Sequence, residues 1–267
     1  MSLAEKPEAE EPILLRADAG GIATLTLNRP GARNALSMPL MAALQDELEA
    51  IALDATIKVV VLAANGPVFC AGHDLREVRS RSDEPFFRAL FDQCSDLMMT
   101  VMKIPQIVIA RVHGMATAAG CQLVASCDLA VAAEEAKFAT PGVNIGLFCS
   151  TPMVAISRNI PRKKIMEMLV TAAPLDAETA ASFGLVNTVV PAAQLDAAVA
   201  KFAEAIASKS PLTLAIGKEA FYKQLDMPVE DAYAYASAVM TRNMLTTDAQ
   251  EGIDAFIEKR KPVWRGE

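Results

Sequence analysis

Histidine is scarce in this sequence, because His73 and His113 are the only two among 267 residues. A zinc helix of the HExxH type needs a pair of histidines on one helical face, so this class of metalloprotein is excluded. Cys70 and His73 have a CxxH spacing, but no second pair of ligands follows. We therefore expect a buried thiol at Cys70 and no metal site.

Sequence signatures of several common enzyme classes are also absent. The chain has no GxxxxGK[ST] phosphate loop, no GxGxxG dinucleotide fingerprint and no GxSxG nucleophile elbow. A Ser-His-Asp hydrolase would have to use His73 or His113, and no nucleophile motif accompanies either residue.

Basic residues are fewer than acidic ones, 25 against 32, which gives a formal charge of −7. Nucleic-acid and anionic-membrane binders need a basic surface, so neither partner is expected. The five cysteines include no CxxC pair, and their odd number argues against a disulfide framework. Residues 1–12 carry four glutamates and lack the pattern of a signal or transit peptide, which predicts an acidic flexible tail. We expect a soluble, cytoplasmic protein.

The order of apolar patterns predicts an α/β fold. Strands are predicted at 13–16, 22–27, 59–62, 107–110, 129–132 and 185–190. Helical patterns lie between them: one is capped by Ser37, and the others cover 84–102, 118–126 and 176–183. Such alternation is typical of crossover connections between strands. The uncharged run 138–157 is broken by proline and glycine and predicts a buried loop followed by a short helix.

After residue 190 the pattern is almost wholly helical. Helices are predicted at 195–208, 212–225, 229–245 and 250–260, with Asp248 and Glu251 placed for a capping box. The composition changes near 208–211, which divides the chain into a core of residues 13–208 and a helical region of residues 209–267. We expect this last region to pack on the core or on another subunit.

Two small-residue turns stand out, Val68–Leu75 and His113–Cys121. Each follows a predicted buried strand and leads into a helix. Turns of this kind leave main-chain N–H groups unpaired, and two of them side by side would hold an oxyanion. Each turn taken alone also fits an ordinary tight connection that needs glycine.

Together with their neighbours, these turns resemble the crotonase family, also called the enoyl-CoA hydratase/isomerase superfamily. The motifs that carry the resemblance follow the family's order: Asn28-Arg29-Pro30 with Asn34-Ala35-Leu36, then Ala71–Leu75, Gly114–Gly120, Phe183–Val186 and Ala255–Arg260. The resemblance covers residues 13–264, and 138–152 and 259–264 are most similar to members described as enoyl-CoA hydratase domain-containing. It implies a ClpP-like spiral of ββα units whose C-terminal helical region builds trimers, often paired into hexamers.

The family stabilises a thioester enolate with a pair of main-chain N–H donors, which carry over to His73 and Ala119. The imidazole of His73 is incidental to this role. Ala119 stands where many members have glycine, which requires a negative φ. The resemblance also implies the contacts of an acyl-CoA substrate, with no separate cofactor. The implied contact residues are Ala71, His73, Asp74, Leu75 and Arg76 for the adenine and pantetheine, Arg29 and Arg33 for phosphates, and Phe256 and Lys259 for a neighbouring subunit's nucleotide.

Both glutamates of the family's hydratases are replaced. Matching the motifs places Gln122 at the first position and Gly142 at the second. An amide orients water but cannot take its proton, and glycine offers no side chain, so ordinary hydration should be weak. Other polar groups for a variant mechanism are Thr140, Asn144, Cys149 and Ser150.

Three hypotheses follow. The first is an enoyl-CoA hydratase/isomerase-like enzyme of the lyase class that uses a variant mechanism. The second is a decarboxylase of methylmalonyl- or ethylmalonyl-CoA, because loss of CO₂ generates an enolate without a strong base. This match is weakened because Cys149 stands where that group has a tyrosine. The third is a relative that binds acyl-CoA without catalysis.

Overall fold

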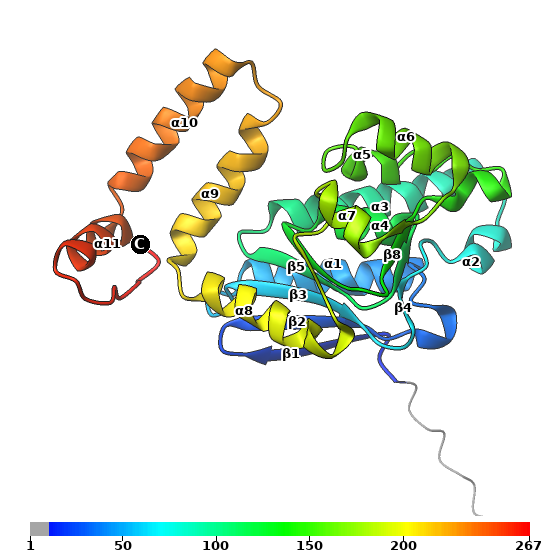
Figure 1. Cartoon of the computed structure of the whole chain (residues 1–267), viewed down its shortest axis with the longest axis horizontal. Coiled ribbons are helices and arrows are strands. Elements are labelled where there is room, and N and C mark those ends of the chain that lie inside the picture. Colours follow the sequence, from blue (N-terminus) through cyan, green and yellow to red (C-terminus); the bar gives the residue numbers. More distant parts are fainter. Residues whose placement is uncertain (1–10) are drawn as a thin grey trace, which may run out of the picture.

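The chain builds its core around a six-stranded sheet, seen in the computed structural model of residues 11–267 (Figure 1). The predicted tail of residues 1–12 lies, up to residue 10, outside the described residues. In spatial order the strands are β1 (Leu14–Ala19), β2 (Ile22–Leu27), β3 (Val59–Ala64), β5 (Ile107–Val112), β7 (Leu129–Ala133) and β10 (Thr188–Val190). The β1–β2 pair is antiparallel and the remaining pairs are parallel.

A second sheet was not predicted from the sequence. Its strands are β4 (Val68–Cys70), β6 (Met115–Thr117), β8 (Lys137–Ala139) and β9 (Leu175–Asp176). Strands β3, β5 and β7 of the first sheet each lead into the next strand of this second sheet, and a helical segment follows. This repeated ββα unit confirms the predicted crotonase-type spiral.

The large sheet is covered on both faces because its central strand is apolar throughout. Val60 and Leu62 of β3 belong to the main core, which includes α1 (Met38–Ala52) and α3 (Glu84–Lys103). Val59 and Val61 point to the opposite face, where α8 (Leu195–Ala207) packs. Side chains of a strand alternate between faces, so a continuous apolar run fits burial on both sides.

Shorter helices complete the core. They are α2 (Leu75–Ser80), α4 (Ala119–Ser126), α5 (Pro152–Ile156), α6 (Arg162–Thr171) and α7 (Ala177–Ser182), with 3₁₀ turns at Pro30–Ala32, Pro141–Ile145 and Ala192–Gln194. The predicted strand 185–190 is reduced to β10, because Gly184 follows the end of α7 with a φ of 88° and the chain bends over residues 185–187 before the strand begins.

Three helices form an arm that extends away from the core in Figure 1: α9 (Pro211–Gln224), α10 (Val229–Met244) and α11 (Thr247–Ile257). The predicted capping box at Asp248 and Glu251 is wrong, because Thr246 caps α11 by accepting a hydrogen bond from the Ala249 N–H. Asp248 is buried and instead accepts hydrogen bonds from Ser210 and from two main-chain N–H groups. Among residues 11–267, no helix has both the length and the apolar character needed to cross a bilayer.

Candidate functional site

The two small-residue turns lie next to each other because the short strands before them pair. Val68 and Cys70 of β4 are in register with Met115 and Ala116 of β6, so both turns leave the second sheet at one edge. Gly120 packs directly on Cys70, and a Cβ at position 120 would overlap the Cys70 carbonyl group. Only glycine allows α4 to approach β4 this closely.

The main-chain N–H groups of His73 and Ala119 have no acceptor among the described residues. Leu36 forms a parallel bridge with His73: the Leu36 N–H donates to the Gly72 carbonyl, and the Asp74 N–H donates to the Leu36 carbonyl. Main-chain groups of successive residues point in opposite directions, so the N–H of His73 points away from Leu36. Ala119 is the first residue of α4, where an N–H has no partner within the helix. A Cβ built on Gly72 would lie 3.3 Å from the Ala119 nitrogen, which shows how close the turns are.

The positive φ at this turn falls on Ala118, with φ 49° and ψ −119°, and Ala119 is absent from the positive-φ residues. Residues other than glycine rarely adopt the backbone conformation of Ala118, and such strain persists only where the surrounding structure imposes it. Here the Ala118 N–H donates to the Ala139 carbonyl at 2.9 Å. This hydrogen bond ties the start of α4 to the end of β8.

Two polar side chains without hydrogen-bond partners belong to residues connected to Ala118. One residue is hydrogen-bonded to Ala118 through its main chain, and the other follows the residue that accepts the Ala118 N–H. Gln122 is 4% exposed and Thr140 is fully buried, and neither the Gln122 Oε1 nor the Thr140 Oγ1 has a hydrogen-bond partner. The Gln122 N–H donates to Ala118, and Thr140 follows Ala139 directly. Buried polar groups are nearly always hydrogen-bonded, so these two oxygens are candidates for contact with a ligand or a water molecule.

The remaining polar candidates divide by burial. Cys149 is buried beside Gly142, whereas Asn144 and Ser150 are exposed and belong to the outer surface of this loop. Burial raises the pKa of Cys149, and it raises the pKa of Cys121 to about 12. Both thiols are therefore neutral at pH 7. Within residues 11–267, no cluster of three or more His, Cys, Asp or Glu side chains is placed to hold a metal ion.

The imidazole of His73 lies inward rather than in solvent. Both ring nitrogens are buried without a hydrogen bond of proper geometry, and the ring meets Phe91 of α3 edge to face at 5.6 Å. Burial lowers the pKa of His73, and the Leu36 backbone acts in the opposite direction. Phe91 is 40% exposed, and its ring lies beside the His73 ring at the surface of α3.

Arg29 and Asp74, which were predicted to contact coenzyme A, bind each other. The Arg29 guanidinium donates to Asp74 at 3.0 Å and to the Ala35 carbonyl at 2.6 Å. Asp74 also caps α2 by accepting from the N–H groups of Arg76 and Glu77. Burial opposes the effect, but these hydrogen bonds together lower the pKa of Asp74. The pair therefore braces the loop that carries His73.

The other predicted coenzyme contacts are spread over two regions. Ala71 is half-buried, and its N–H donates to the Arg33 carbonyl at 3.1 Å. The side chains of Arg33, Leu75 and Arg76 are exposed on the loops around His73. Phe256 and Lys259 belong to the end of the arm, far from these loops in the same chain (Figure 1).

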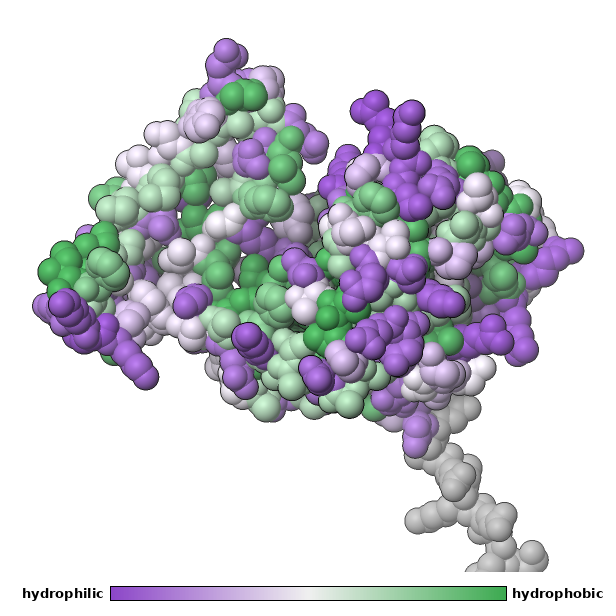
Figure 2. All heavy atoms as spheres, viewed as in Figure 1, coloured by the Kyte–Doolittle hydropathy of each residue, from purple (hydrophilic) through white to green (hydrophobic). Residues whose placement is uncertain are grey.

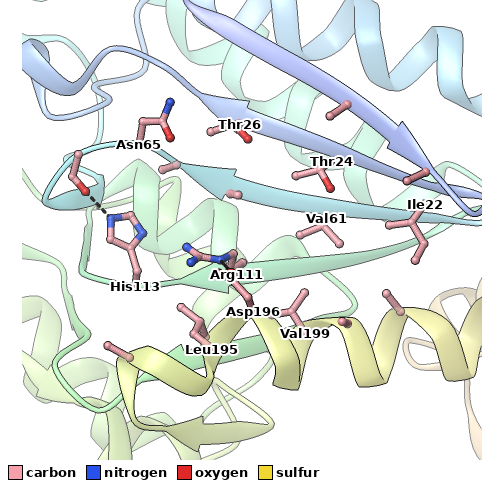
Figure 3. Close-up of a pocket in the computed structure, with 18 residues that line it drawn as sticks. Ile22, Thr24, Thr26, Val61, Asn65, Arg111, His113, Leu195, Asp196 and Val199 are labelled. Carbon is pink, nitrogen blue, oxygen red and sulfur yellow. Dashed lines mark hydrogen bonds and ion pairs between the residues drawn. The ribbon is translucent and has the colours of Figure 1, made fainter.

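A groove of about 810 Å³ lies on the opposite face of the large sheet and includes none of the predicted site residues. Its walls come from β1, β2, β3, β5 and α8, and Figure 3 shows Arg111 beside Asp196 with His113 at one end. The Arg111 guanidinium donates to Asp196 at 2.5 Å, and His113 pairs with the Gly66 carbonyl at 2.7 Å. The two histidines of the chain thus lie on different faces of this sheet.

Comparison with known proteins gives similarity over nearly the whole chain. The enoyl-CoA hydratase domain-containing protein 3 of Rattus norvegicus is 45% identical over 97% of this chain and 86% of its own length. The crystal structure of an enoyl-CoA hydratase of Mycobacterium smegmatis has 50% identity and a TM-score of 0.93, covering 95% of this chain and 99% of that one. The crystal structure of human enoyl Coenzyme A hydratase domain-containing protein 3 has 45% identity and the same TM-score of 0.93, covering 95% and 100%.

The prediction of a cytoplasmic protein is wrong by this comparison, because the rat, mouse and human relatives are all named mitochondrial proteins. The five cysteines are free and buried, which fits any reducing compartment. The number and spacing of cysteines therefore cannot distinguish a cytoplasmic protein from a protein of a reducing organelle.

The family model described as Enoyl-CoA hydratase/isomerase matches residues 17–267. This match includes the strand pairs, both turns and the helical arm. It agrees with the resemblance predicted from the motifs and with the solved structures above. The chain belongs to the enoyl-CoA hydratase/isomerase family, that is, to the crotonases.

Proposed function

We propose that this protein acts on acyl-CoA thioesters and stabilises the thioester enolate with the main-chain N–H groups of His73 and Ala119. The supporting observation is that both donors, on adjacent turns, lack an acceptor among the described residues. Negative charge on the thioester oxygen would meet these donors and the N-terminal end of α4. Preorganised donors of this kind lower the barrier to any reaction that passes through an enolate.

Ordinary hydration of an enoyl-CoA is expected to be weak. Gln122 and Gly142 cannot transfer protons, and general acid–base catalysis typically contributes about 10²–10⁴-fold. Gln122 and Thr140 would instead orient water or a polar group of the acyl chain, which accounts for their burial without partners. The activity proposed is therefore a variant hydratase or isomerase reaction.

The coenzyme would lie along the loop after β4. Leu75, Arg76 and Arg33 are exposed there, and Arg33 and Arg76 offer charge to the phosphates. Arg29 and Asp74 would act by holding Ala71 and His73 in place rather than by touching phosphate. Phe256 and Lys259 would reach the nucleotide of a neighbouring copy in a homotrimer or a hexamer. No cofactor beyond the coenzyme A of the substrate is proposed.

Decarboxylation of a malonyl-type CoA is a second candidate, and the buried, uncharged side chains of Gln122 and Thr140 favour it. Neither the Gln122 Oε1 nor the Thr140 Oγ1 has a hydrogen-bond partner among the described residues. A substrate carboxylate beside Gln122 and Thr140 would be desolvated without a cation, which favours its loss as CO₂.

A panel of CoA thioesters tests these alternatives on the purified protein. Binding is measured by calorimetry with butyryl-CoA, and turnover with crotonyl-CoA and with methylmalonyl- and ethylmalonyl-CoA. Hydration of crotonyl-CoA supports the first candidate, and CO₂ release supports the second. Binding without either reaction would identify a non-catalytic acyl-CoA-binding relative, and the absence of binding to every thioester would refute the proposal.

A further inference from the structure

The chain turns back on itself at the end of α11, and residues 260–267, here named the strap, return toward the start of α9 (Figure 1). Lys259 makes the turn with a φ of 58°. The Arg260 N–H donates to the Ala255 carbonyl at 2.9 Å, and the Lys259 N–H donates to Phe256 at 3.3 Å. Helices often end in this way, but the left-handed residue is usually glycine.

One part of the strap is bound to the side of α11. The Arg260 guanidinium donates to both Glu251 oxygens, at 2.6 and 2.8 Å, and the Val263 N–H donates to the same carboxylate at 2.7 Å. The Trp264 ring lies against Gly252, where a Cβ would come within 3.1 Å of it. Helix α11 therefore offers the strap a charged acceptor and a stretch of backbone without a side chain.

The rest of the strap is bound at the junction between α8 and α9. Asp248 is 1% exposed and accepts hydrogen bonds from the Ser210 hydroxyl and from two main-chain N–H groups of the strap, at 2.7 and 3.0 Å. The Trp264 indole N–H donates to the Ser208 carbonyl at 2.8 Å. Loss of a buried acceptor leaves each of its donors unpaired. These contacts fix the end of α11 relative to the start of α9.

Resting on the proposed function, in which Phe256 and Lys259 reach the nucleotide of a neighbouring copy, we propose that the strap orients these two side chains and that Asp248 is the positioning residue. Phe256 lies in the last turn of α11, and Lys259 is the residue at which the chain reverses into the strap. A lysine keeps a left-handed conformation only while its surroundings impose it. Release of the strap would therefore let Lys259 leave the position from which it meets the nucleotide.

The test compares butyryl-CoA with butyryl-pantetheine, which lacks the nucleotide. Asp248→Ala removes the acceptor that holds the strap, and Asp254→Ala removes an exposed carboxylate of the same helix as the matched control. We expect Asp248→Ala to raise Kd for butyryl-CoA about tenfold by calorimetry, and Kd for butyryl-pantetheine by less than about threefold. The control should bind both thioesters as the wild type does, and light scattering should give the same particle size for all three proteins.

Trp264 is the only tryptophan of the chain, so its fluorescence reports release of the strap directly. Its emission should move to longer wavelength in Asp248→Ala, while the far-ultraviolet circular dichroism stays that of the wild type. Gly252→Leu is a second variant that removes no hydrogen-bonding group, because its side chain would occupy the place of the Trp264 ring. It should show the same emission shift and the same selective loss of butyryl-CoA affinity.

Unchanged emission in both variants would overturn the proposal, as would an emission shift that leaves Kd for butyryl-CoA unchanged. An equal loss of affinity for both thioesters, or dissociation of the variants into smaller particles, would also overturn it, since either result would show a structural role alone. A wild type that binds neither thioester would instead refute the proposed function, whatever the Trp264 emission shows.

Discussion

Gly142 stands where the family's second carboxylate is expected, and its surroundings leave no room for one. A Cβ at this position would lie 2.7 Å from the Leu147 carbonyl oxygen and 2.9 Å from the Cys149 sulfur. Real Cβ atoms do not approach a main-chain oxygen this closely, so the loop that carries Leu147 would have to move. The missing carboxylate is thus coupled to the conformation of residues 141–149.

Replacing Gly142 by glutamate should therefore fail to create a hydratase. We expect Gly142→Glu to lower the free energy of unfolding by about 3 kcal/mol, because the backbone must shift to accept the side chain. Urea unfolding measures this. Gly217→Ala is the control: it lies in α9 with nothing near its added Cβ and should stabilise by about 0.5–1 kcal/mol. Unchanged stability of Gly142→Glu would contradict the close packing.

Single residues at the site were only partly predictable from the sequence. The motifs placed His73 and Ala119 on adjacent turns, because these turns have a recognisable order of small residues, and their role as donors stays a prediction. The strained φ of Ala118 and the contact between His73 and Phe91 were not foreseen. Both depend on how α3 and β8 pack against the turns, which local sequence patterns do not encode.

Elements with a clear period were predicted well, and very short ones were not. Helices α1, α3 and α8 and strands β2, β3 and β5 match their apolar patterns. The strands of the second sheet have only two or three residues, too few for an alternation of side chains to register. Strands β4, β6 and β8 form because the longer strands before them bring their ends together.

Helix α9 is attached to the core through a buried ion pair. Lys218 is its only buried side chain, and its ammonium group lies 2.7 Å from Asp128 and donates to the carbonyls of Val101 and Gln106. Tyr222 donates to the other Asp128 oxygen at 2.9 Å. Asp128 therefore anchors α9 to the core through both of its carboxylate oxygens.

Removing one partner of this pair should be costly. Lys218→Met leaves the Asp128 carboxylate buried beside uncompensated carbonyls, and we expect a loss of about 3–5 kcal/mol in the free energy of unfolding. Chemical denaturation measures the loss. Lys209→Met, at an exposed position near the start of the same helix, should change stability by less than about 0.5 kcal/mol. Equal effects of the two substitutions would show that the ion pair does not anchor the arm.

Large hydrophobic side chains are exposed along the arm of the molecule. Figure 2 shows hydrophobic residues across α9, α10 and α11. Val229 is 71% exposed, Leu245 is 75% and Phe256 is 85%. An extended apolar surface of this kind marks a protein interface, which agrees with the proposed oligomer.

We expect the protein to be a trimer or a hexamer by size-exclusion chromatography with light scattering. Val229→Asp combined with Leu245→Asp should shift it toward the monomer, because a buried unpaired carboxylate opposes association. The control is Leu53→Asp on the core, where Leu53 is 90% exposed at the end of α1. A monomeric wild type, or loss of the oligomer in the control alone, would contradict an interface on the arm.

The donors proposed to hold the enolate belong to the main chain, so every residue type except proline supplies them at positions 73 and 119. The capacity to bind a thioester oxygen therefore survives mutation of these side chains, provided that the turns keep their shape. Replacing the proton-transfer groups therefore leaves the proposed anion site intact. New side chains around it would act on the same class of thioester.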